Sequence, residues 1–154
     1  MTENEITFRA AREEDLPALV SMLANDELGQ HREDPSIPLI PEYLEAFKAI
    51  ADNPHQLLVV ADLSGEVVGT LQLSFIPGLA RKGAWRGQIE AVRIAETVRG
   101  LGLGERMIEW AVAQCRAHGC VLVQLTTDKT RPDAHRFYEK LGFTASHLGY
   151  KLPL

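Results

Sequence analysis

The hydrophobic positions along the chain follow two periods, one typical of helices and one typical of strands. The first helical stripe, Leu16, Leu19, Val20 and Leu23, begins directly after Asp15, an acid that can cap a helix. From the same spacing and from proline and glycine end signals, we expect further helices at about 42–51, 103–118 and 132–141.

Runs of apolar residues between turn signals predict six strands. They are expected at 6–9, 56–63, 66–76, 88–94, 120–127 and 143–152. The turn Ser64-Gly65 joins the second and third strands as a hairpin. Two irregular stretches, Asn25–Pro41 and Pro77–Gly87, remain between these elements, and long loops are often functional. Hairpins early and helical connections late predict a mixed α/β (α+β) sheet, antiparallel first and more parallel later.

Composition limits the class of protein. The 154 residues are 45% hydrophobic and 24% charged, and no linker interrupts them, so we expect a single domain over residues 1–154. The net charge of -5 argues against nucleic-acid binding. Without a signal region or a long apolar run, we expect a cytoplasmic protein that makes no membrane contact. Cys115 and Cys120 are interpreted as reduced, inward-facing thiols, and the five histidines lack metal-ligand spacing, so no metal is expected.

A glycine-rich turn carries the clearest chemical signal. In VRGLGLGERMIEW, Gly100, Gly102 and Gly104 alternate between a predicted strand and a predicted helix. Glycine accepts positive φ and lets a ligand approach the backbone, and a helix start offers free N–H groups to an anion. A Walker A loop needs a lysine after its last glycine, and a dinucleotide fingerprint needs G-x-G-x-x-G, so neither fits. The alternative is that these glycines only make a tight turn.

The turn also reads R-x-x-G-x-G, which resembles motif A of the GNAT N-acetyltransferase superfamily. QIEAVRI resembles that family's fourth strand, RPDAHRFYEKLGF its motif B, and FRAAREEDLPAL its opening strand and helix. The closing residues resemble a bacterial small-domain subgroup. This resemblance covers nearly the whole chain. It implies the GNAT fold, with a partly antiparallel central sheet of six or seven strands, helices on both faces, and a splay between the fourth and fifth strands.

The resemblance implies a reaction as well. The protein would move an acetyl group from acetyl-CoA to a primary amine of an unidentified small molecule or peptide, by direct attack in a ternary complex and without a metal. One alternative is a non-catalytic acyl-CoA-binding or regulatory module of the same fold. Another is an enzyme that uses the glycine turn for ATP or NAD. A homodimer is left open, as is the use of longer acyl-CoAs.

Two residues have catalytic roles by this resemblance. Tyr138 is the expected general acid for the leaving thiolate, although Phe137 and Tyr138 could both be core residues. Glu90 is the expected general base, with a solvated strand position, an ammonium anchor or an ordered water as alternatives. The resemblance further assigns acetyl-CoA binding to Val92, Arg93, Ile94, Arg99, Gly100, Leu101, Gly102, Leu103, Gly104, Glu105, Asp128, Lys129, Arg131 and Arg136.

The acceptor is not predicted, because the two irregular stretches give opposite signals. The first holds the acids Asp26, Glu27, Glu33 and Asp34, which suit a cationic amine. The second holds the bases Arg81, Lys82 and Arg86, which suit an amine that also bears a carboxylate.

Overall fold

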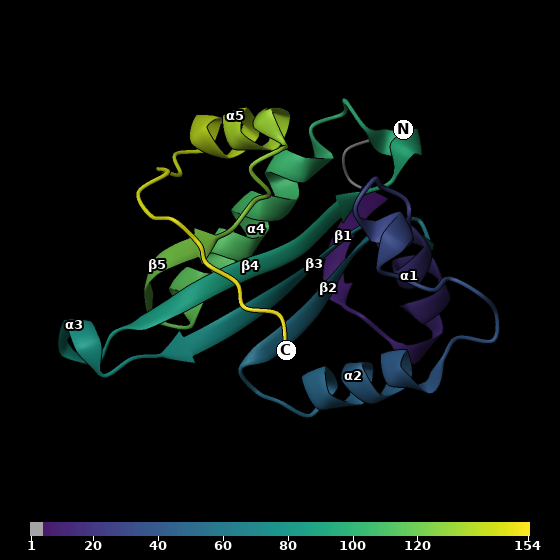
Figure 1. Cartoon of the computed structure of the whole chain (residues 1–154), viewed down its shortest axis with the longest axis horizontal. Helices are drawn as coiled ribbons and strands as arrows, with labels where there is room; N and C mark the ends of the chain where they lie inside the picture. Colours follow the sequence, from purple (N-terminus) through teal and green to yellow (C-terminus); the bar gives the residue numbers. More distant parts are fainter. Residues whose placement is uncertain (1–4) are drawn as a thin grey trace. The chain divides into compact units, whose positions relative to one another are not determined.

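Five strands form one sheet in the computed structural model, which describes residues 5–154 (Figure 1). The strands follow one another across the sheet in chain order. Each of the first three is antiparallel to the next, and β5 runs parallel to β4. The strands are β1 Ile6–Ala10, β2 Gln56–Leu63, β3 Glu66–Pro77, β4 Trp85–Ile94 and β5 Cys120–Leu125.

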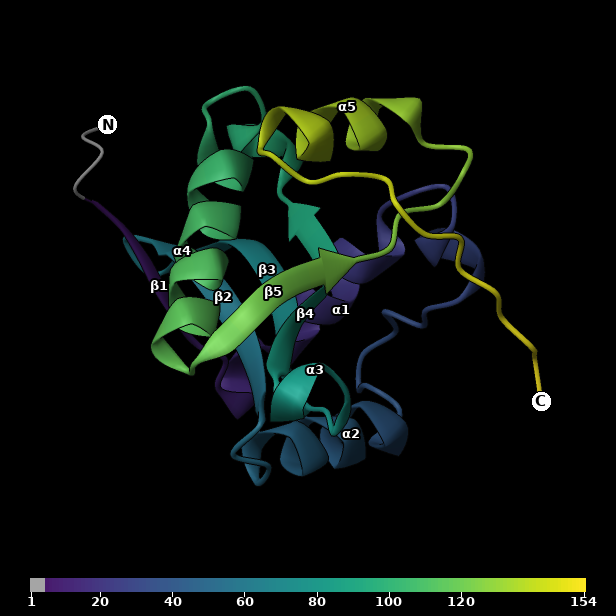
Figure 2. The ribbon, with the colours of Figure 1, turned by 90° about the vertical axis from the view of Figure 1, so that its left-hand side faces the viewer.

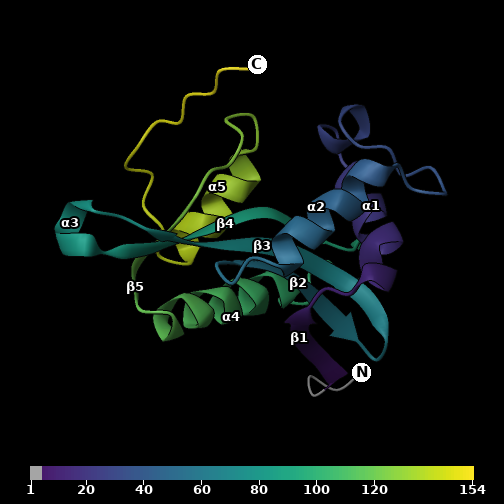
Figure 3. The same ribbon diagram turned by 90° about the horizontal axis from the view of Figure 1, so that it is seen from below.

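The chain forms two compact units, the first ending at Gln124 and the second comprising Leu125–Leu154. In the first unit α1 and α2 lie on one face of the sheet, and α4 lies on the other (Figures 2 and 3). The second unit contains α5. The helices are α1 Leu16–Ala24, α2 Pro41–Ala51, α3 Ala80–Gly83, α4 Leu103–Ala117 and α5 Pro132–Lys140.

Two glycines let α4 pack closely against the sheet. A Cβ added at Gly69 would lie 3.3 Å from the Met107 sulfur, and one at Gly87 would overlap the Cys115 sulfur. Met107 and Cys115 are buried on the inner face of α4. This close contact fixes the helix against β3 and β4, and it therefore fixes the turn from which the helix begins.

A partly buried charge network fixes α1 against the opposite side of the same sheet. The Arg9 guanidinium on β1 binds Asp15 at 2.7 Å and Asp62 on β2 at 3.0 Å. Hydrogen bonds from Arg9 hold the pKa of both carboxyl groups below the usual value. Asp15 is buried, and it also accepts a hydrogen bond from the Arg12 backbone N–H at 2.7 Å. The expected cap residue at the start of α1 thus acts mainly as the partner of Arg9.

The mixed α/β class and the helices on both faces are confirmed, but the strand count is wrong. The sheet has five strands within residues 5–154, whereas six or seven were expected. The final strand predicted at 143–152 is not formed. Its apolar pattern suits a strand, but a strand also needs a hydrogen-bonded neighbour, and none of the five described strands pairs with it. β4 begins at Trp85, three residues earlier than expected. The expectation of a single domain stays a prediction, and so does the splay between β4 and β5.

Candidate active site

The glycine turn holds its backbone in conformations that only glycine adopts readily. Gly100 has φ of 82° and Gly102 has φ of 76°, both in the left-handed region. Gly102 is the N-cap of α4, and no side chain caps this helix end. The sequence-based interpretation of a strand, a glycine turn and a helix is therefore matched by the local structure.

The start of α4 presents backbone N–H groups to open space. The first helical bond of α4 runs from the Arg106 N–H to the Gly102 carbonyl at 3.2 Å. The preceding amides of Leu103, Gly104 and Glu105 therefore have no acceptor within the helix. A Cβ built at Gly100 or Gly102 would meet no atom within 4 Å. The residues present thus fit an anionic group such as a diphosphate, since a helix N-terminus attracts negative charge.

The side chains around the turn contribute less than its backbone. Arg99 donates to the Ile94 carbonyl at 3.3 Å and lies 3.8 Å from Glu96. Leu101 is exposed, whereas Leu103 is buried beneath the turn. Arg99 is therefore held along the turn by its own neighbours, and a phosphate would have to draw it away from Glu96.

A bulge interrupts β4 in its centre. The register passes from Gln72 opposite Glu90 to Thr70 opposite Arg93, so β4 has one residue more than β3 across this step. Ala91 takes φ of 56° there, although it is not glycine. A bulge releases backbone groups from the ladder, and strained backbone of this kind often marks a functional site. Val92, whose backbone was expected to polarise the acetyl carbonyl, directly follows this residue.

An ion pair links the bulged strand to the first irregular stretch. Arg93 Nε lies 2.8 Å from Asp26 Oδ2, and both side chains are about four-fifths covered. Arg93 also donates to the Val92 carbonyl at 2.9 Å. The Arg93 side chain therefore positions the loop after α1 beside β4, and the cofactor contact that the resemblance implied for Arg93 stays a prediction.

Glu90 lies exposed on β4, one residue before the bulge. It accepts a hydrogen bond from Gln88 at 3.2 Å, and Gln88 in turn accepts one from Gln124 on β5 at 3.0 Å. This row of polar side chains crosses from β5 to β4 and ends beside the strained backbone. The position is open to solvent, as a base acting directly or through water requires.

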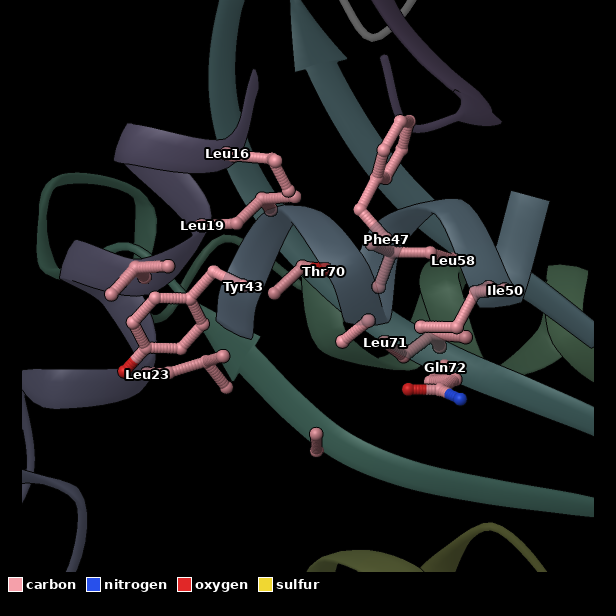
Figure 4. Close-up of a pocket in the computed structure, with 13 residues that line it drawn as sticks. Leu16, Leu19, Leu23, Tyr43, Phe47, Ile50, Leu58, Thr70, Leu71 and Gln72 are labelled. Atoms are coloured by element: carbon pink, nitrogen blue, oxygen red, sulfur yellow. The ribbon is translucent and has the colours of Figure 1, made fainter. Parts of the chain in front are cut away.

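A cavity of about 170 Å³ lies between α1, α2 and the sheet (Figure 4). Leu19 and Leu23 enter it from α1, Tyr43 and Phe47 from α2, and Ala91 of the bulge also lines it. None of its thirteen lining residues, all from the part of the chain described here, carries a charged side chain. The strained segment of β4 therefore borders an apolar cavity.

The polar groups of this cavity already have partners in the protein. Thr70 donates to the Val59 carbonyl at 2.8 Å, and Gln72 donates to Gln56 at 3.0 Å. The Tyr43 hydroxyl donates to Glu33 at 2.9 Å, and burial raises its pKa. Glu33 is one of the acids that made the first irregular stretch a candidate acceptor loop, and here it serves to hold the Tyr43 ring.

Four of the expected cofactor-binding residues belong to the second unit. Asp128 accepts from the Thr130 backbone at 2.9 Å and from the Thr130 hydroxyl at 2.6 Å, which makes a tight turn before α5. Arg136 forms an ion pair with Asp133 within α5. Lys129 and Arg131 are exposed. Asp128 therefore stabilises this turn, and the cofactor contacts expected of all four residues stay predictions.

Tyr138 is half-buried on α5. Its ring centroid lies 5.1 Å from that of Phe137 and 5.8 Å from that of Phe143, in edge-to-face geometry. The Phe143 backbone N–H also donates to the Tyr138 carbonyl at 3.0 Å. The ring is thus fixed by two aromatic neighbours, while its expected catalytic role stays a prediction.

The thiols of the chain are not suited to nucleophilic catalysis. Burial raises the pKa of Cys115 to about 11 and also raises that of Cys120, so both are protonated near neutral pH. Cys115 packs inward as expected, and Cys120 is half-buried. No cluster of three or more metal-ligating side chains occurs within residues 5–154. In the same range, no helix is long and apolar enough to span a membrane.

Sequence reasoning missed the bulge, the link between Arg93 and Asp26, and the cavity. A positive φ at Ala91 leaves no compositional mark, because alanine does not favour it. The cavity had a partial signal, since Leu19 and Leu23 belong to the first apolar stripe of the sequence. Such a stripe predicts which side of a helix packs inward, but it does not show that a space remains between two helices.

The sequence profile of the acetyltransferase (GNAT) family matches residues 19–143. Among curated proteins, the chain is 32% identical to the aminoalkylphosphonate N-acetyltransferase of Salmonella typhimurium. The alignment spans 108 residues and covers 70% of each chain. It is 37% identical to the glucosamine 6-phosphate N-acetyltransferase of Trypanosoma brucei brucei. This alignment spans 92 residues and covers 59% of this chain and 60% of that one.

Among solved structures, the chain resembles one from Bacillus halodurans C-125 that is described as a transcriptional regulator. The two sequences are 48% identical, the TM-score is 0.94, and the match covers 97% of this chain and 99% of that chain.

Proposed function

Since the chain belongs to the acetyltransferase (GNAT) family, we propose that it transfers an acetyl group from acetyl-CoA to a primary amine by direct attack. The amine nitrogen forms a bond to the thioester carbonyl carbon, the carbon–sulfur bond breaks, and the nitrogen loses a proton while the thiolate gains one. The observation that carries the proposal is that a turn with open helix-start amides follows a bulged strand. The amides at the head of α4 suit the diphosphate, and the strained backbone at Ala91 suits the reacting carbonyl.

In this proposal the backbone does most of the binding. The amides of Leu103, Gly104 and Glu105 hold the diphosphate, and the backbone of Val92 and Ile94 lines the arm that carries the thioester. Glu90 takes the amine proton directly or through water, because it is exposed beside the bulge. Tyr138 donates the proton that the thiolate needs.

Direct attack is favoured over an acyl-enzyme because no activated thiol is at hand. The raised pKa of Cys115 and Cys120 keeps both sulfurs protonated. The mechanism is tested by initial velocities measured over a grid of acetyl-CoA and amine concentrations. Intersecting lines in double-reciprocal plots are expected for a ternary complex, and parallel lines would indicate a covalent acetyl-enzyme instead.

The cavity between α1 and α2 is the acceptor site in this proposal, and it favours an amine with an apolar group. The two curated relatives are named for acceptors that bear a phosphonate or a phosphate. Such groups are usually bound by Arg or Lys, and none of the residues lining this cavity is charged. We therefore expect the acceptor amine to place a hydrocarbon portion against Leu23 and Phe47, with its nitrogen toward Ala91.

The activity is tested by thiol release from acetyl-CoA with a panel of amines. The panel includes alkylamines, aralkylamines, an aminoalkylphosphonate, glucosamine 6-phosphate and a lysine peptide. Turnover is expected with at least one apolar amine. Tight acetyl-CoA binding without turnover on any amine would instead support a binding or regulatory module. Thermal stabilisation by ATP or NAD but not by acetyl-CoA would contradict the proposal as a whole.

A further inference from the structure

The ion pair between Arg93 and Asp26 lies where two parts of the candidate site meet. Arg93 follows the bulge of β4, and Asp26 follows α1, whose residue Leu23 lines the apolar cavity. Asn25, beside Asp26, donates to Glu96 at 3.3 Å, and Glu96 belongs to the segment that leads into the glycine turn. The loop after α1 is therefore linked both to the bulged strand and to the segment that follows it.

The side chain of Arg93 donates to a carbonyl within the bulge. The register between β3 and β4 passes over Ala91 and Val92, so these two residues have no directly opposed partner. Arg93 Nη1 donates to the Val92 carbonyl at 2.9 Å. Because the donor is charged, this hydrogen bond is stronger than one between neutral groups. The guanidinium thus supports the backbone at the point where the ladder is interrupted.

Asp26 in turn fixes the guanidinium of Arg93. Asp26 Oδ2 lies 2.8 Å from Arg93 Nε, and both atoms are buried from solvent. Asp26 Oδ1 accepts a hydrogen bond from the Gly29 backbone N–H, which holds the carboxylate in place. Removal of either partner from a covered pair leaves an uncompensated charge, so the two side chains act as a unit. The charge of Asp26 is therefore used by Arg93 and does not serve to attract a cationic amine.

We propose that Asp26 and Arg93 are positioning residues for acetyl transfer, which together hold the backbone of Ala91 and Val92 in the bulged geometry that aligns the thioester with the amine. This inference rests on the proposed function. Ala91 has φ of 56°, a conformation that is strained for a residue with a Cβ and persists only where surrounding contacts enforce it. The contacts of Arg93 with Val92 and Asp26 are contacts of this kind. Loss of alignment slows the chemical step, whereas the diphosphate is bound elsewhere, at the start of α4, in the proposed site.

A second aspartate of the same unit offers a matched control. Asp62 accepts from Arg9 Nε at 3.0 Å through Oδ2 and from the Gly65 backbone N–H at 2.7 Å through Oδ1. Asp26 has the same two kinds of partner, and the side chains are similarly covered, with 17% of Asp62 and 23% of Asp26 exposed. Substitution by asparagine removes one carboxylate charge from an arginine in each case, but only Asp26 is linked to the bulge of β4.

The first test measures the rate of acetyl transfer in a single turnover, with the amine that reacts fastest. Asp26→Asn and Arg93→Lys are expected to lower this rate at least about tenfold, while the dissociation constant of acetyl-CoA changes less than about threefold. Asp62→Asn is expected to keep the rate within about twofold. Arg93→Lys retains the charge but lacks the planar group that contacts both Asp26 and Val92, so it remains informative if Asp26→Asn does not fold. Wild-type rates in both site variants, or an equal loss in Asp62→Asn, would overturn the proposal.

The second test needs no turnover, so it separates this inference from the proposed function. The ¹³Cα and ¹³Cβ chemical shifts of Ala91 report its backbone angles. In Asp26→Asn and Arg93→Lys they are expected to move toward the values of an extended strand, whereas Asp62→Asn should leave them as in wild type. Unchanged shifts in both site variants would show that the pair does not hold the bulge. If wild type acetylates no amine, the proposed function fails, and the Ala91 shifts alone then decide whether the pair holds the bulge.

Discussion

Replacement of Gly102 by valine separates the strain of the turn from its role in binding. Gly102 has φ of 76°, and a Cβ there meets no protein atom within 4 Å. A side chain in this conformation costs about 1–2 kcal/mol of stability, which lowers the melting temperature of a chain this size by about 2–8 °C. The variant should therefore fold, with its new side chain standing over the amides of α4.

The effect on acetyl-CoA binding should be larger than the effect on stability. Blocking two charge-assisted hydrogen bonds from the amides of α4 removes about 3–6 kcal/mol. The dissociation constant measured by calorimetry should then rise about 100-fold or more.

Gly119, just beyond the other end of α4, is the matched control for this experiment. It has φ of 77° and equally open surroundings. Gly119→Val should therefore lose the same stability and keep wild-type affinity for acetyl-CoA. If both variants lose affinity equally, or if Gly102→Val binds as wild type does, the turn is not the diphosphate site.

Three further outcomes are expected. Tyr138→Phe should lower kcat by about 100-fold with little change in acetyl-CoA affinity, within the range of a general acid; an unchanged kcat when chemistry limits turnover would remove Tyr138 from the mechanism. In a series of linear alkylamines, kcat/KM should rise about fourfold per methylene until the cavity is filled, and a flat series would exclude the apolar acceptor site. Asp15→Asn should destabilise the protein at pH 7 by about 1–3 kcal/mol. Because Arg9 lowers the Asp15 pKa in the folded state, this stabilisation is present above pH 4 and lost as the pH falls further. Denaturant melts from pH 7 to pH 2 should therefore converge for the two proteins, and parallel curves would contradict the role of Asp15.

The elements of the fold could be predicted because their signals are local. The stripe from Leu16 to Leu23 and the hairpin turn at Ser64-Gly65 each specify one element within a few residues. The glycine turn was recognisable for the same reason, since Gly100 and Gly102 are needed for its left-handed backbone. Features that depend on residues far apart in the sequence, such as the bulge in β4 and the ion pair of Arg93, could not be derived in this way.

Two features show where local reasoning ends. The segment 143–152 has the pattern of a strand, but a strand forms only where a neighbouring backbone completes its ladder, and the pattern does not identify that neighbour. The ion pair between Arg93 and Asp26, which is 67 positions earlier in the sequence, has no local signal, and the cofactor contact expected of Arg93 stays a prediction. The strain at Ala91 is likewise set by the register between β3 and β4. The pairing of distant segments therefore sets the backbone geometry at Ala91, beside which the proposed reaction takes place.

Amide chemical shifts measured during titration test the central claim most directly. Spectra of ¹⁵N-labelled protein are recorded with acetyl-CoA and, separately, with acetyl-pantetheine, which has the thioester arm but no diphosphate. The amides of Leu103, Gly104 and Glu105 should shift with acetyl-CoA and stay in place with acetyl-pantetheine, whereas Val92 should respond to both. If those three amides ignore acetyl-CoA, or respond equally to the arm alone, the helix start does not bind the diphosphate and the proposed site is wrong.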